Sequence, residues 1–176
     1  LNINKRVGQV SNSKNQVMLV IKDFIYMSNS VWKEQGSEML NYVCFTMATK
    51  FIDQAEKQIS LHPPSAFPYG QVVVDLIGLI PAFRSILMGL LIQRCPFIIP
   101  RYPPRQPGQS ETDWKRDLGY KVTEGQVEEE SAYTERMSGL IMFYAAIIQS
   151  SPIRPSKICL DLMYIDSLIY RSRQSI

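Results

Sequence analysis

The sequence contains a single histidine, His62, among its 176 residues. One histidine is too few for most zinc sites and catalytic triads, and no P-loop, dinucleotide-binding glycine motif or zinc-protease motif is present. The net charge is also small, because 19 basic and 16 acidic residues leave a formal net charge of +3. Any anion site must therefore be local, and direct nucleic-acid binding is not expected. We predict a chain that is not an enzyme and that acts by binding partners.

The three cysteines, Cys44, Cys95 and Cys159, are far apart, odd in number and form no CxxC pair. This pattern argues against a disulfide framework and favours a reduced, intracellular compartment, with the cysteines in the core. Long apolar runs are missing too, since a membrane span needs about 20 apolar residues and no stretch here approaches that length. The chain begins at Leu1 rather than at a methionine, so we expect a fragment or a processed product.

What the sequence does contain is a series of helical patterns in a chain that is 45% hydrophobic. Apolar residues recur every three or four positions between breaks, which predicts packed amphipathic helices. The sequence therefore predicts an all-α fold of stacked antiparallel helices. The predicted helices cover residues 13–27, 37–60, 66–79, 81–94, 110–119 and 128–149, with a last helix after Ser156. Between them we predict an irregular lead-in over 1–10, a polar turn over 28–36, a proline-rich extended connector over 95–110 and a loop over 120–126.

Two of these segments have distinctive sequence patterns. The triplet Val72–Val74 is β-branched, so a strand is the alternative to a helix there. The helix over 128–149 has the most regular apolar stripe, and three glutamates at its start match the positive end of the helix dipole. We predict that these glutamates, Glu128, Glu129 and Glu130, form a solvated helix start.

Several motifs resemble one known family when they are read together. They are residues 6–12 (RVGQVSN), 50–56 (KFIDQAE) leading into 65–68 (SAFP), 94–97 (RCPF), 118–121 (LGYK), 135–140 (ERMSGL) and 144–149 (YAAIIQ). Their order and spacing over about residues 2–149 resemble the conserved C-terminal domain of the GLE-one mRNA-export mediators. The segment from ERMSGL to YAAIIQ is the most specific part of this resemblance.

The resemblance implies a HEAT-like or MIF4G-like helical domain. On this basis residues 1–149 are the N-terminal portion of such a domain, and 150–176 are a divergent tail with a final helix. We expect the domain to be incomplete at its C-terminus, as in a truncated product. Half of a helical stack would leave an apolar face uncovered unless the last helix covers it.

The resemblance also implies a function at the nuclear pore. Members of the family bind and activate a DEAD-box RNA helicase on the cytoplasmic face of the pore, with inositol hexakisphosphate as a tether, and so promote poly(A) RNA export. The further partners that it implies are nucleoporins and translation initiation and termination factors. The implied locations are the nuclear pore complex, the cytoplasm and the nucleus.

A tether dense in phosphate requires several basic side chains that converge from different elements. By their positions in the matching motifs, the resemblance assigns this role to Arg6, Lys50 and Arg94. Arg101 and Arg105 in the proline connector are lesser candidates. The sequence departs from the family where other members carry basic residues, and these departures predict a weakened inositol phosphate site; they are Thr49, Asp53, Leu90 and Gln93.

Three alternatives remain open from the sequence. The first is a MIF4G-like scaffold that binds RNA or translation factors directly, through a contiguous basic or aromatic face. The second is an inert truncated product. The third is an enzyme in which Cys95 is a nucleophile and His62 its base.

Overall fold

The computed structural model describes residues 2–99 and 103–153, and its architecture is almost entirely helical. The all-α prediction is confirmed. The α-helices are α1 (Ile3–Val7), α2 (Lys14–Gln54), α3 (Ala66–Leu79), α4 (Pro81–Arg94), α5 (Glu111–Asp117) and α6 (Glu130–Gln149). A π-helical turn η1 (Ala55–Ile59), a 3₁₀ turn η2 (Pro63–Ser65) and two short strands, β1 (Val122–Thr123) and β2 (Gln126–Val127), complete the described elements. The helix predicted after Ser156 lies outside the described residues.

The predictions for the middle of the chain are confirmed. Pro81 occupies the first turn of α4, where its fixed φ favours helix and its missing N–H costs nothing. The triplet Val72–Val74 is buried in the helix α3, so the strand alternative is wrong. Helix α5 lies within the predicted segment 110–119 and begins with a capping interaction, in which the backbone N–H of Asp113 donates to Ser110 Oγ at 3.1 Å.

Three local predictions are wrong. The lead-in over 1–10 contains helix α1, which Asn2 caps by accepting from the backbone N–H of Lys5. Residues 28–35 are helical rather than a turn, because most of their polar side chains belong to an exposed helix surface, and the break comes only at Gly36 (φ 82°). The predicted loop over 120–126 contains a small antiparallel hairpin in which Val122 pairs with Val127.

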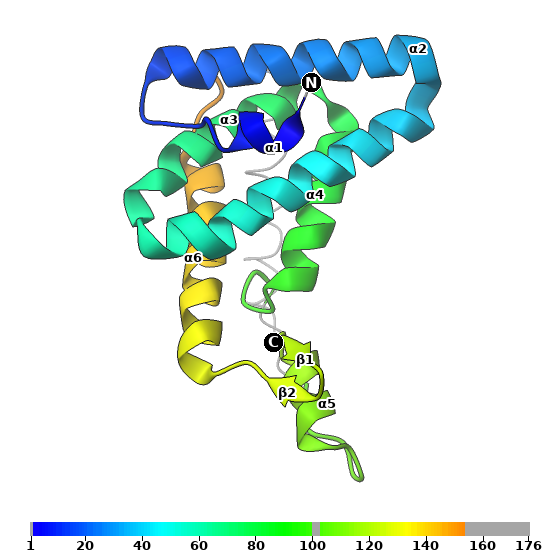
Figure 1. Cartoon of the computed structure of the whole chain (residues 1–176), viewed down its shortest axis with the longest axis vertical. Coiled ribbons are helices and arrows are strands. Elements are labelled where there is room, and N and C mark those ends of the chain that lie inside the picture. The colour runs from blue at the N-terminus through cyan, green and yellow to red at the C-terminus, as the bar shows by residue number, and fades with distance from the viewer. Residues whose placement is uncertain (1, 100–102, 154–176) are drawn as a thin grey trace, which may run out of the picture.

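Helix α2 bends back at Gly36, so that its first arm lies along the top of the view and its second arm runs diagonally down across the front of the molecule (Figure 1). A positive φ of this kind is open to glycine at little cost, which explains why the bend falls at that residue. Helices α3 and α4 pack against α2, and α6 packs against α3 and the π-helical turn η1. Helix α5 and the hairpin extend from the lower end of the molecule, below α4 and the start of α6 (Figure 1).

The core is organised around the ring of Phe51, in the second arm of α2. Four aromatic rings from four helical segments surround it at centroid distances of 6.0–6.5 Å, namely Phe24, Tyr69, Phe83 and Phe143. All five side chains are fully buried. Edge and offset contacts of this kind add to the hydrophobic free energy of burial, so one residue links both arms of α2 to α3, α4 and α6.

Helix α6 passes so close to η1 that there is no room for a side chain at Gly139. A Cβ atom built there would overlap the carbonyl oxygen of Ala55 and lie 3.0 Å from Ser60 Cβ. The π-helical turn sends the N–H of Ser60 to this same Ala55 carbonyl. Gly139 is therefore required by backbone packing, which gives the ERMSGL motif a physical reason for its glycine.

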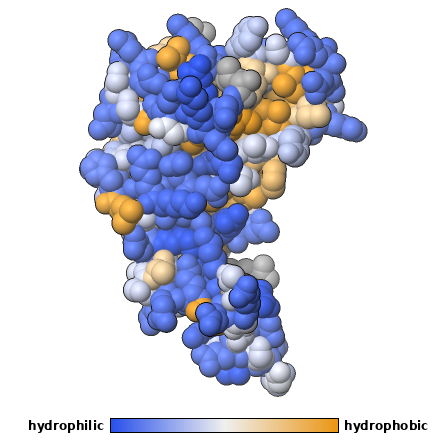
Figure 2. All heavy atoms as spheres, in the orientation of Figure 1, coloured by the Kyte–Doolittle hydropathy of each residue, from blue (hydrophilic) through white to orange (hydrophobic). Residues whose placement is uncertain are grey.

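The surface is divided unevenly between polar and apolar residues. On the face in Figure 2, hydrophobic atoms gather between the two arms of α2, while the end that carries α5 and the hairpin is mainly hydrophilic. Several large apolar side chains of α2 are exposed, among them Tyr26, Trp32, Tyr42 and Phe45. Within residues 2–99 and 103–153, no helix is both long enough and apolar enough to span a membrane.

The substitution Gly139→Ala should destabilise the fold because the new methyl group would push α6 away from η1. We expect a loss of about 1–3 kcal/mol in the free energy of unfolding, measured by urea denaturation. Gly89→Ala in α4 is the matched control, since nothing lies within 4 Å of a Cβ at that position. Alanine favours helix more than glycine does, so the free energy of unfolding of this control should stay the same or rise by up to about 1 kcal/mol. Equal effects of the two substitutions would contradict the close-packing account.

Candidate functional site: a buried carboxylate with converging cations

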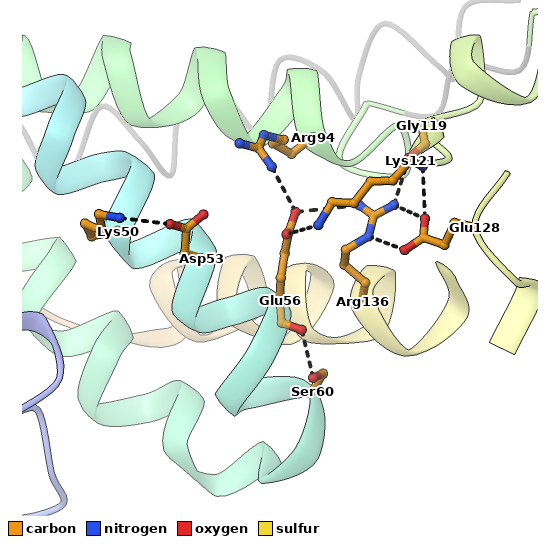
Figure 3. Close-up of polar contacts among 9 residues, drawn as sticks. All are labelled: Lys50, Asp53, Glu56, Ser60, Arg94, Gly119, Lys121, Glu128 and Arg136. Carbon is orange, nitrogen blue, oxygen red and sulfur yellow. Dashed lines mark hydrogen bonds and ion pairs between the residues drawn. The ribbon is translucent and has the colours of Figure 1, made fainter. Parts of the chain in front are cut away.

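The carboxylate of Glu56 lies at the centre of an ion cluster where four elements meet (Figure 3). Its side chain is only 4% exposed, and three cations from other elements reach it. Lys121 Nζ lies 2.6 Å from Oε2, while the guanidinium nitrogens of Arg94 and Arg136 lie 3.5 and 3.6 Å from Oε1. A buried charge is tolerated only when it is paired in this way.

Arg136 is the buried cation of the cluster. Its guanidinium donates two hydrogen bonds to the Glu128 carboxylate, at 2.9 and 2.6 Å, and a third to the Gly119 carbonyl at 2.9 Å. Burial on its own would lower the pKa of Arg136, but the hydrogen bonds and charge of Glu128, with the charge of Glu56, raise it above its ordinary value. Arg136 therefore stays charged and ties α6 to the segment before the hairpin.

Glu128 is the second carboxylate of the cluster. It also accepts from the backbone N–H of Lys121 at 3.0 Å. Burial on its own would raise the pKa of Glu128, but the hydrogen bonds from Arg136 and Lys121 and the charges of both residues lower it overall. The prediction of a solvated Glu128 is therefore wrong, because this side chain is 12% exposed and ion-paired. Helix α6 begins at Glu130, with Glu129 as its N-cap.

The motifs that carry the family resemblance converge on this cluster. Glu56 ends the KFIDQAE motif, Arg94 begins RCPF, Lys121 ends LGYK, and Arg136 lies in ERMSGL. Segments that are up to 80 positions apart in the sequence thus meet at one carboxylate (Figure 3). These motifs therefore each contribute a charged residue to one ion cluster, which is a structural reason for them to occur together.

The three cations assigned from the sequence are distributed over two places. Lys50 and Arg94 lie on α2 and α4, which pack against each other, and both appear in the close-up of the cluster (Figure 3). Arg94 contacts Glu56, and Lys50 lies 3.4 Å from Asp53 of its own helix. Arg6 in α1 contacts Gln9 and lies 3.0 Å from Asp23 in the first arm of α2. Among the described residues, none of its polar contacts is with Lys50 or Arg94.

The four departures from the family pattern lie on these same helices. Thr49 turns its hydroxyl back to the carbonyl of Phe45 at 2.8 Å. Asp53 is occupied by Lys50, and Leu90 packs against the core. Gln93 is exposed and lines a cavity of about 560 Å³ between the end of α4 and the Gly119 region. None of these four side chains supplies a positive charge, so the local field depends on the remaining cations.

Among the described residues, the thiols and the imidazole do not form a site, and Cys159 lies outside the described part of the chain. Cys44 and Cys95 are free and fully buried, and burial raises the pKa of both thiols, that of Cys44 to about 11. A nucleophilic cysteine requires the opposite shift. His62 is exposed in the turn before η2. In the described part of the chain, no group of three or more histidine, cysteine or acidic residues is placed to hold a metal ion.

Sequence reasoning missed the residues that organise the cluster. Glu56, Lys121 and Arg136 all lie inside motifs that we had identified, but a single sequence does not show that they face each other. A signal was present in Arg136, which is a charged residue among the apolar positions of the α6 stripe. A charge in that place indicates a buried ion pair.

The sequence matches known proteins over most of its length. A family model described as "GLE1-like protein" matches residues 1–165. The mRNA export factor GLE1 of Danio rerio is 37% identical over 120 residues, which are 68% of this chain and 17% of the relative. The mRNA export factor GLE1 of Saccharomyces cerevisiae is 26% identical over 147 residues, which are 82% of this chain and 26% of the relative. The chain thus spans about a quarter or less of these two relatives.

The fold matches a solved structure described as an S. cerevisiae variant Dbp5 C-terminal domain bound to Gle1 and IP6. The match has a TM-score of 0.78 and 23% sequence identity, and it covers 90% of this chain and 51% of the matched chain. A related structure with a Gle1 variant gives the same values. This likeness confirms the predicted kind of helical fold, and the matched chain extends well beyond the aligned part.

Removal of the Glu128 charge should destabilise the fold in a pH-dependent manner. Because folding lowers the pKa of Glu128, its stabilisation is present above the unfolded-state pKa, near 4.3, and is lost as the pH falls through the folded-state value. We expect Glu128→Gln to cost about 1–3 kcal/mol at pH 7 and little below about pH 3, measured by urea denaturation.

Glu129→Gln is the control for this experiment, since Glu129 is exposed and its side chain makes no capping hydrogen bond. It should change the free energy of unfolding by less than about 1 kcal/mol at any pH. A loss in Glu128→Gln that stays constant from pH 7 to pH 3 would contradict the ion-pair account.

Proposed function

This chain belongs to the GLE1-like protein family, and from that premise we propose that it binds a DEAD-box RNA helicase with inositol hexakisphosphate as a tether and stimulates that helicase during mRNA export. Two kinds of observation support the proposal. The relatives are named mRNA export factors rather than enzymes, and the chain of similar fold is described as Gle1 in complex with Dbp5 and IP6.

The observation that carries the proposal for this chain is the convergence of Arg94 and Lys121 on one carboxylate. Both cations are partly exposed, at 36% and 49% of their side chains, whereas Glu56 beneath them is buried. With Arg136 and Glu128 included, the cluster has three positive and two negative charges, which leaves a net charge of +1. A phosphate at its rim would gain charge-assisted hydrogen bonds to these partly exposed cations.

We assign the contacts with the inositol phosphate to Arg94 and Lys50, with Arg6 as a third contact from α1. Lys50 is 37% exposed and lies on the helix that packs against α4. Arg6 is 27% exposed and extends the set toward the first arm of α2. The three cations come from three helices, which is what a ligand with phosphates on all sides of a ring requires.

The proposed mechanism is differential binding. A protein that holds one arrangement of the two helicase lobes more tightly than another shifts the equilibrium of the enzyme toward the arrangement that it binds. If inositol hexakisphosphate bridges the basic residues of this chain and those of the helicase, it raises the affinity for only that arrangement. In this mechanism the chain supplies binding contacts and needs no catalytic residues, which fits the raised thiol pKa of Cys44 and Cys95.

The proposal also includes a cellular location and further partners. We place the chain at the cytoplasmic face of the nuclear pore complex, with additional populations in the cytoplasm and the nucleus. Nucleoporins and translation initiation and termination factors are its further proposed partners. These assignments rest on the family alone, because they concern whole proteins of which this chain spans only a part.

The direct test is the ATPase rate of the partner helicase with the full chain, with and without inositol hexakisphosphate. We expect a rise that requires both components, and we expect Lys50→Gln and Arg94→Gln each to reduce it several-fold. Lys50→Gln is the cleaner variant, since its only described ion pair is with the peripheral Asp53. Arg116→Gln removes one positive charge from α5, where Arg116 pairs with Asp113, and should leave the stimulation unchanged.

Two outcomes would contradict the proposal. A folded chain that never changes the helicase rate would identify an inert product. A stimulation that is independent of inositol hexakisphosphate and unaffected by Lys50→Gln and Arg94→Gln would place the helicase contact elsewhere on the molecule.

A further inference from the structure

Each of the three cations assigned to the anion site has its own carboxylate partner within the chain. Lys50 lies 3.4 Å from Asp53, Arg94 lies 3.5 Å from Glu56, and Arg6 lies 3.0 Å from Asp23. The chain therefore places one fixed negative charge beside every positive charge that it offers to a phosphate.

We propose that Asp53 and Glu56 act as internal competitors of the phosphate ligand and so determine the specificity of the site. Phosphate groups have to compete with these carboxylates for Lys50 and Arg94, so a polyphosphate of high charge density binds and a single phosphate does not. This inference rests on the proposed function, because it concerns the selectivity of the same anion site.

The geometry leaves the cations available for such an exchange. Both ion pairs are longer than the 2.7–2.9 Å that is typical of a charge-assisted hydrogen bond, and Lys50 and Arg94 each keep more than a third of their side chains exposed. Neither cation is locked in place as Arg136 is, with three hydrogen bonds and a side chain only 7% exposed. A ligand could therefore recruit Lys50 and Arg94 without dismantling the core.

The site is selective because the carboxylate that competes for each cation belongs to the chain itself, whereas a phosphate ligand comes from solution. Asp53 is attached to the helix of Lys50, so it competes at a high effective concentration and loses no translational freedom when it binds. A free monophosphate bears that entropic cost for one contact. A hexakisphosphate bears it once, and after the first phosphate binds, its other phosphates reach neighbouring cations as intramolecular ligands.

The two carboxylates differ in what else they hold. Glu56 is buried and is also bound by Lys121 and Arg136, so its removal would disturb the fold as well as the site. Asp53 has 28% of its side chain exposed, and its polar contact in the described part of the chain is with Lys50 alone. Asp53→Asn is therefore the variant that tests competition without a structural effect.

The experiment is calorimetric titration of the full chain with inositol hexakisphosphate and, separately, with inorganic phosphate, each at two salt concentrations. The variants are Asp53→Asn and Glu111→Gln. The latter removes one carboxylate charge as well, but from the exposed pair with Lys115 on α5. We expect Asp53→Asn to bind inositol hexakisphosphate roughly two- to fivefold more tightly than the unmodified chain, in proportion to the free energy of one partly exposed ion pair.

In the same titrations Glu111→Gln should bind like the unmodified chain, and inorganic phosphate should bind measurably only to Asp53→Asn. If inositol hexakisphosphate binds only to Asp53→Asn and not to the unmodified chain, Asp53 blocks the site instead of selecting its ligand, and the specificity inference is wrong. If the unmodified chain binds the hexakisphosphate and Asp53→Asn binds it equally well, the competition is absent although the anion site stands. If neither protein binds it, both the inference and the proposed anion site are wrong.

Discussion

The structure depends on one buried carboxylate. Glu56 points from a π-helical turn into a region with almost no solvent access, where an unpaired charge would cost several kcal/mol. Cations from α4, from the residue before the hairpin and from α6 compensate it, so none of these elements is free to move independently. The close approach of Gly139 to the carbonyl of Ala55 holds α6 against the same turn. Packing and electrostatics thus fix one junction between four segments.

Much of the fold was predictable from the sequence, and the exceptions have physical causes. Local patterns were sufficient for α3, α4 and α6, because their apolar stripes and proline breaks act within a few residues. Only the polar end of the first arm of α2, residues 28–35, was mistaken for a turn, since an exposed helix surface lacks an apolar signal. The π-helical turn and the hairpin depend on distant partners, namely Gly139 for the turn and the Lys121–Glu128 hydrogen bonds for the hairpin.

The candidate site was only partly predictable for a similar reason. Motif position led to Lys50 and Arg94, which the structure places on two packed helices, and to Arg6, which contacts a different part of α2. It also singled out Asp53, three residues from Lys50, but it did not lead to Asp23 or Glu56, because pairing across the fold is a three-dimensional property. Arg6, Lys50 and Arg94 each pair with a carboxylate, so these three cations do not by themselves form the contiguous positive face that nucleic acid requires.

The central claim, that the charge of Glu56 holds this junction together, is tested most directly by the free energy of unfolding of Glu56→Gln. A glutamine has nearly the same shape and removes only the charge, which leaves Arg136 with one carboxylate fewer. We expect Glu56→Gln to lose about 3 kcal/mol of the free energy of unfolding in urea denaturation at pH 7. The same substitution at the exposed Glu135 should cost less than about 0.5 kcal/mol. Equal and small losses for the two variants would contradict the claim.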